Sequence, residues 1–67
     1  MLQLTINGQP QHFDKPLNVQ QLLECMSLQN KRIAVERNGE IVPRSQFAVQ
    51  ALSDGDRLEI VVAVGGG

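Results

Sequence analysis

The chain has 67 residues, of which 42% are hydrophobic. This length supports a single domain and argues against an internal catalytic cleft, because a pocket of ~300 Å³ would take up much of so small a core. Lys and Arg together number 6 against 7 Asp and Glu, the cations are scattered, and Trp and Tyr are absent. These features argue against a nucleic-acid partner. No apolar run approaches the ~20 residues of a membrane helix, so we expect a cytoplasmic protein with no membrane partner.

The chain contains one cysteine, Cys25, and one histidine, His12. A single cysteine excludes an internal disulfide, and these two residues are too few for a zinc site built from Cys and His ligands. Cys25 falls within a predicted amphipathic helix, where we expect it to pack as a small hydrophobe. No catalytic side chain, metal or bound cofactor is predicted.

The first predicted element is a β-hairpin. Apolar and polar side chains alternate over residues 2–6, which is the pattern of a half-buried strand. Asn7-Gly8 then tolerates the positive φ angles of a tight turn. The chain is expected to return as a second strand over about residues 11–14, with Phe13 directed toward the core.

A helix is predicted next, and its start is well marked. Asn18 is placed to cap the first amides, and Gln21 lies three residues later, where a capping box requires it. The apolar stripe then recurs at helical spacing and fades near residues 28–30. Its members are Val19, Leu22, Leu23 and Met26.

Two further strands surround a second turn. Residues 33–37 predict a strand, Asn38-Gly39 a turn, and residues 41–42 a short return. Residues 44–51 fit either a short helical turn or an irregular connection, with Phe47 and Leu52 as anchors to the core.

The last predicted elements are a turn and a strand. Asp54-Gly55-Asp56 predicts a turn rather than a metal site, because two carboxylates alone make a poor cage for a cation. Residues 57–62 predict the final strand, with Leu58, Ile60 and Val62 on its core face.

This order of elements predicts an α+β fold in which a mixed four- to five-stranded sheet packs on one main helix. It is the order of a β-grasp, or ubiquitin-like, domain. We expect one domain over residues 1–64, followed by a flexible glycine tail over residues 65–67.

The glycine tail is the part of the sequence that points to chemistry. Three glycines at the end of a chain are commonly a frayed tail or a cloning remnant, but here Gly65, Gly66 and Gly67 directly follow an apolar strand. Because glycine lacks a Cβ, such a thread can enter a narrow channel and deliver the ionised α-carboxylate of Gly67. That carboxylate needs activation, as in an acyl-adenylate. The sequence contains no phosphate-binding loop, so we predict a separate enzyme that uses ATP.

Partner contacts are predicted beside the tail. Alternation in the final strand places Val61 and Ala63 on the face opposite the core, and we expect a partner to cover them together with Val64. Arg44 and Arg57 are further candidates, although solvation alone also explains such charges.

The segments DGDRLEIV at 54–61 and VGGG at 64–67 resemble the end of the ThiS family, sulfur carriers of thiamine biosynthesis. The resemblance extends over the whole chain. It includes residues 1–8, 19–23, 33–38 and 41–44.

The resemblance implies a mechanism. A ThiF-type adenylyltransferase would use ATP to adenylylate Gly67, and sulfur from a cysteine desulfurase would convert it to a thiocarboxylate. Thiazole synthase, ThiG, would take that sulfur to build the thiazole ring. Gly66 matches the glycine that precedes the modified one in the family's diglycine end, and Gly65 is an extra glycine that adds reach.

Three rival functions remain open on the sequence. The small subunit of molybdopterin synthase shares the fold and the diglycine end. A ubiquitin-like modifier would be joined to lysines through Gly67. A plain β-grasp interaction module would carry the glycines only incidentally.

Overall fold

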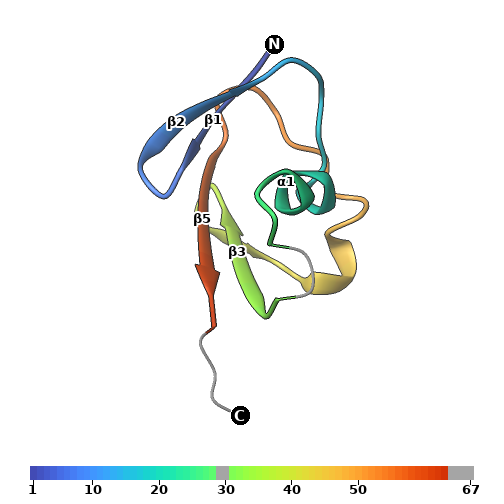
Figure 1. Cartoon of the computed structure of the whole chain (residues 1–67). Coiled ribbons are helices and arrows are strands. Elements are labelled where there is room, and N and C mark those ends of the chain that lie inside the picture. Colours follow the sequence, from blue (N-terminus) through green and yellow to red (C-terminus); the bar gives the residue numbers. More distant parts are fainter. Residues whose placement is uncertain (29–30, 64–67) are drawn as a thin grey trace.

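The computed structural model describes residues 1–28 and 31–63, so predictions for residues 29–30 and 64–67 lie outside the described residues. Figure 1 shows a sheet with one helix, α1, lying against one of its faces. The strand order is β2-β1-β5-β3-β4, with β1 and β5 parallel and the other pairs antiparallel. This confirms the predicted β-grasp fold. In chain order the elements are β1 (Leu2–Ile6), β2 (Gln9–Phe13), α1 (Val19–Cys25), β3 (Ile33–Arg37), β4 (Glu40–Val42), the 3-10 helix η1 (Arg44–Gln46) and β5 (Arg57–Val62).

Both predicted hairpin turns are present. Asn7 and Gly8 have φ angles of 51° and 83°, and Asn38 and Gly39 have 52° and 88°. Positive φ at both central residues is the geometry of the two-residue turn that matches strand twist. Because the first turn is so short, Ile6 pairs directly with Gln9. The predicted returning strand is therefore present as β2, but it spans Gln9–Phe13 and begins earlier than the predicted range of about residues 11–14.

The N-terminus of α1 has the predicted capping box. The N–H of Gln21 donates to Oδ1 of Asn18 at 2.7 Å, and the N–H of Asn18 donates to Oε1 of Gln21 at 2.9 Å. Two further amides of the first turn bond to the loop after η1, since Val19 donates to the carbonyl of Gln50 and Gln20 to that of Phe47. These bonds satisfy amides that have no partner within the helix, and they fix the loop against α1.

The C-terminus of α1 closes in a Schellman motif. Ser27 has a φ of 60°, its N–H donates to the carbonyl of Glu24, and the N–H of Leu28 donates to the carbonyl of Leu23. This pair of bonds defines the motif, although glycine usually occupies the residue with positive φ. The turn brings Leu28 back toward Leu23, and both side chains belong to the core or pack against it.

One core lies between the sheet and α1. The predicted apolar faces of β1, α1 and β5 supply most of it, and the anchors expected in the loop are also buried. Phe13 and Met26 are half-buried against it, as predicted. The buried members are Leu2, Leu4, Ile6, Leu17, Val19, Leu22, Leu23, Val35, Val42, Phe47, Leu52, Leu58 and Ile60.

The structure corrects the predicted burial of Val62 and Cys25, and it decides between the two alternatives left open for residues 44–51. Val62 was expected on the core face beside Ile60, but it is 37% exposed. Its partner across the strands, Ile33, is also only half-buried, so the core does not extend fully to this end of β5. Cys25 was expected to pack as a small hydrophobe, but it is exposed at the last position of α1, on the solvent side of the helix. Of the two alternatives left open for residues 44–51, the structure shows a short helical turn, η1, over Arg44–Gln46.

Candidate functional site

Strand β5 leads directly to the predicted reactive end and is the central strand of the sheet (Figure 1). On one side it pairs in parallel with β1, through Thr5 with Arg57 and Ile6 with Leu58. On the other side it pairs with β3 along its length, ending at Val62 opposite Ile33. A strand held on both sides is a rigid base from which the chain leaves the domain.

The side chain of Asn7 extends the pairing of β5 beyond the end of β1. The N–H of Ile60 donates to Oδ1 of Asn7 at 2.7 Å, and Nδ2 of Asn7 donates to the carbonyl of Ile60 at 3.1 Å. The backbone N–H of Asn7 donates to the carbonyl of Leu58 at 2.9 Å. A side-chain amide therefore takes the place of one more strand residue.

The second turn asparagine binds the start of β5. The N–H of Arg57 donates to Oδ1 of Asn38 at 2.9 Å, and the N–H of Asn38 donates to the carbonyl of Arg57 at 2.8 Å. Nδ2 of Asn38 donates to Asp56 at 3.0 Å. Each Asn-Gly turn thus contributes an asparagine that fixes β5 from one side.

Asp56 anchors the chain as it enters β5. It is the buried charged residue of the described part, and Oδ2 accepts from Nε of Arg37 at 2.7 Å and from the N–H of Ser53 at 2.8 Å. Burial by itself raises the pKa of Asp56, but the hydrogen bonds from Ser53, Arg37 and Asn38, with the charge of Arg37, bring that pKa below its ordinary value. The predicted turn at Asp54-Gly55-Asp56 is present, and it is closed by a bond from the N–H of Asp56 to the carbonyl of Ser53 at 3.0 Å.

The end of β5 is exposed on the side away from α1, which we call the open face. Val61 is 61% exposed and pairs across the strands with Ala34, which is also exposed. Ala63 is exposed, and its N–H donates to the carbonyl of Arg32 at 2.8 Å. The predicted position of Val61 opposite the core is confirmed by the alternating burial along β5. Ala63 follows the end of β5 and is exposed, as predicted. Whether a partner covers them stays a prediction.

The remaining predicted site residues, Val64 and Gly65, Gly66 and Gly67, lie outside the described residues. Over residues 1–28 and 31–63, no group of three or more His, Cys, Asp or Glu side chains is arranged to hold a metal ion. In the same ranges, no helix has the length and apolar character to cross a membrane.

Sequence reasoning missed the residues that hold β5 in place. Asn7 and Asn38 were identified as turn residues, and Asp56 as part of a turn. The side-chain bonds from Asn7 and Asn38 to β5 join residues 19 to 53 positions apart in the chain. The one available signal was that both turns use asparagine, whose amide carries a donor and an acceptor as the backbone does.

Comparisons with known proteins agree on one family. The sequence model described as the ThiS family matches residues 4–67. The sulfur carrier protein ThiS of Bacillus subtilis is 43% identical over 65 residues, which cover 96% of this chain and 98% of that protein. The crystal structure of the thiamine biosynthesis protein ThiS of Geobacter metallireducens has a TM-score of 0.83 to this structure at 38% identity. That match covers 98% of this chain and 100% of the Geobacter chain.

Another relative is much longer. A protein named thiazole synthase from Paramagnetospirillum magneticum is 46% identical over 66 residues, which cover 98% of this chain but 20% of that protein. The chain therefore spans about a fifth of this relative and nearly all of the Bacillus one. With the matches of sequence and of fold together, the chain belongs to the ThiS family, the sulfur carrier proteins of thiamine biosynthesis.

Proposed function

We propose that this chain carries sulfur for thiamine biosynthesis as a thiocarboxylate on the α-carboxyl group of Gly67. The observation that supports this most directly is the match of the ThiS family over residues 4–67, a range that includes the glycine tail. The anchoring of β5 adds a physical reason. The asparagine and aspartate contacts fix that strand as far as Ile60, and the chain then continues to an exposed residue at Ala63.

The proposed chemistry takes place in three steps that begin at the carboxyl group. An oxygen of the Gly67 carboxylate attacks the α-phosphorus of ATP on a ThiF-type adenylyltransferase, and pyrophosphate leaves. A persulfide, which a desulfurase forms from cysteine, then attacks the carbonyl carbon through its terminal sulfur, and AMP leaves. A thiol reductant cleaves the resulting acyl disulfide, which releases the thiocarboxylate and leaves the other sulfur in a disulfide with the reductant. The sulfur replaces one carboxyl oxygen, and thiazole synthase is the enzyme that accepts it.

The pairing with thiazole synthase has its own support. The two relatives named thiazole synthase, from Paramagnetospirillum magneticum and Magnetococcus marinus, each contain a segment similar to this chain that occupies 20% of their length. A carrier segment and a synthase joined in one polypeptide are held at high effective concentration. We infer that the separate chain meets the same kind of enzyme as a partner.

Intact mass spectrometry of the protein from its native cell type tests the proposal. We expect a species heavier by the difference between sulfur and oxygen, which an alkylating reagent for thiocarboxylates converts to the alkylated form. Adding one alanine after Gly67 should leave the fold intact and remove this species.

The rival functions predict different results from the same material. A ladder of conjugates that disappears without Gly67 would identify a protein modifier. A stable complex with a large molybdopterin synthase subunit, and none with thiazole synthase, would assign the other pathway. Sulfur transfer by the alanine-extended variant would contradict the proposed chemistry.

A further inference from the structure

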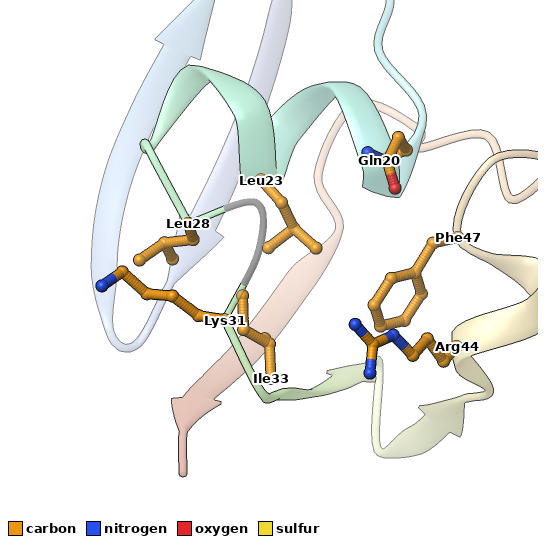
Figure 2. Close-up of a pocket in the computed structure, with 7 residues that line it drawn as sticks. All are labelled: Gln20, Leu23, Leu28, Lys31, Ile33, Arg44 and Phe47. Carbon is orange, nitrogen blue, oxygen red and sulfur yellow. The ribbon is translucent and has the colours of Figure 1, made fainter. Parts of the chain in front are cut away.

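A groove lies between α1, the start of β3 and η1, on the helix side of the sheet (Figure 2). Its volume is about 260 Å³. This is below the ~300 Å³ at which small-molecule sites begin, so the groove suits one or two side chains of a protein partner. Its lining combines an apolar floor with polar groups around it. The lining residues are Gln20, Leu23, Leu28, Lys31, Ile33, Arg44 and Phe47.

The floor of the groove is the outer surface of the core. Leu23 and Phe47 are buried, whereas Leu28 and Ile33 are half-buried and leave part of their side chains accessible. The Schellman motif sets the position of Leu28, because the bond from its N–H to the carbonyl of Leu23 folds the chain back over the end of α1. The floor is therefore held by backbone hydrogen bonds and does not depend on a partner to form.

The groove adjoins the end of β5. Ile33 lines the groove and pairs with Val62 across the strands. Paired residues project from the same face of a sheet, so the exposed side chain of Val62 continues the apolar floor toward the point where β5 ends. A partner that holds the glycine tail would lie next to this surface.

The charges around the groove favour a negatively charged occupant. Lys31 and Arg44 are both exposed, and Figure 2 shows Arg44 beside Phe47 on the η1 side and Lys31 with Leu28 on the opposite side. The ion pair found over residues 1–28 and 31–63 joins Arg37 to Asp56, away from the groove. No acidic side chain is among the lining residues. One cation on each side of an apolar floor favours an occupant that carries carboxylates next to an aliphatic or aromatic side chain.

We propose that this groove docks an acidic segment of thiazole synthase, with an apolar side chain on Leu28, Ile33 and Val62 and carboxylates paired with Lys31 and Arg44. This inference rests on the proposed function for the identity of the partner. It adds a second contact surface, on the helix side of the sheet, to the open face at Val61 and Ala63. The tail would bring the reactive carboxyl group, and the groove would hold the carrier while the reaction proceeds.

Binding measurements with purified thiazole synthase from the same organism test the proposal. We expect the double variant Lys31→Gln, Arg44→Gln to bind about tenfold more weakly, with a smaller dependence of affinity on salt, because two charge contacts are lost. Val62→Ser should also weaken binding, because it removes part of the apolar surface. Lys15→Gln is the control for the loss of one charge, and it is compared with the single variants Lys31→Gln and Arg44→Gln as well as with the double variant. It removes one positive charge from an exposed residue outside the groove and should bind as the unmodified chain does.

NMR measurements, together with the binding and sulfur-transfer results, distinguish failure of this docking proposal from failure of the proposed function. In NMR spectra, the signals of Leu28 and Ile33 should shift when the synthase is added, and they should also shift for a chain lacking residues 65–67. If the double variant binds as tightly as Lys15→Gln, or if it loses affinity for the adenylyltransferase alone, the proposed occupant is wrong. If the unmodified chain gains no sulfur but its binding depends on the groove, the proposed chemistry fails and the docking surface stands.

Discussion

The side-chain amide of Asn7 gives Ile60 both hydrogen bonds that a neighbouring strand residue would give it, at 2.7 and 3.1 Å. Asn7 is also the first residue of a two-residue turn, with a φ of 51°. One residue thus reverses the chain after β1 and continues the support of β5 toward the end that we propose to be reactive.

Replacing Asn7 should separate these two roles. Asn7→Gly keeps the positive φ but removes the amide, and we expect it to lower the free energy of unfolding by about 1–2 kcal/mol. Asn7→Ala loses the amide but keeps a Cβ at positive φ, so we expect it to be about 1 kcal/mol less stable than Asn7→Gly. Denaturant unfolding of both variants measures the difference. Because Asn7→Ala and the unmodified chain both carry a Cβ at this positive φ, equal stability of these two would show that the amide bonds contribute nothing.

Asp56 should make the free energy of unfolding decrease as pH falls into the acid range. Its pKa in the folded state lies below its ordinary value, so its contribution is fully present above the unfolded-state pKa of ~3.9 and is lost as pH falls through the folded-state pKa. Asp56→Asn should lower the free energy of unfolding by about 2 kcal/mol at neutral pH and flatten the decline below about pH 4. Thermal unfolding from pH 2 to 7 tests this, with Asp14→Asn as an exposed control.

Ser27 offers a stabilising change. Its φ of 60° at the end of α1 is a conformation that a residue with a Cβ adopts at a cost. Ser27→Gly should raise the free energy of unfolding by about 0.5–1 kcal/mol, whereas Ser27→Ala keeps the Cβ and should give no gain. A gain from alanine equal to that from glycine would exclude backbone strain as the cause.

Substitutions of the neighbouring residues Ile60 and Val61 in β5 should affect different properties, stability for Ile60 and activation for Val61. Ile60 is 6% exposed, so Ile60→Ala should cost about 2–4 kcal/mol of stability. Val61 is 61% exposed, so Val61→Ser should leave stability nearly unchanged and should slow adenylylation if the open face contacts the activating enzyme. Chemical denaturation and a pyrophosphate-release assay measure the two effects. Unchanged activation kinetics would remove Val61 from the predicted contacts.

The sequence by itself determined the elements and most of the core. Alternation over residues 2–6, the capping pair Asn18 and Gln21, and the two Asn-Gly turns each depend on chemistry within a few residues. Local signals of this kind are complete in the chain itself, which is why the β-grasp order followed from them. The glycine tail was likewise visible in the sequence, and its proposed chemistry belongs to the backbone.

Only the tertiary structure decided how β5 is held and what surrounds its end. The bonds from Asn7 and Asn38 to β5, and the burial of Asp56 beside Arg37, join residues far apart in the chain, so no local pattern announces them. The exposure of Val62 has the same origin. Alternation shows which face a side chain occupies, but packing against α1 decides how far along the strand that face is covered.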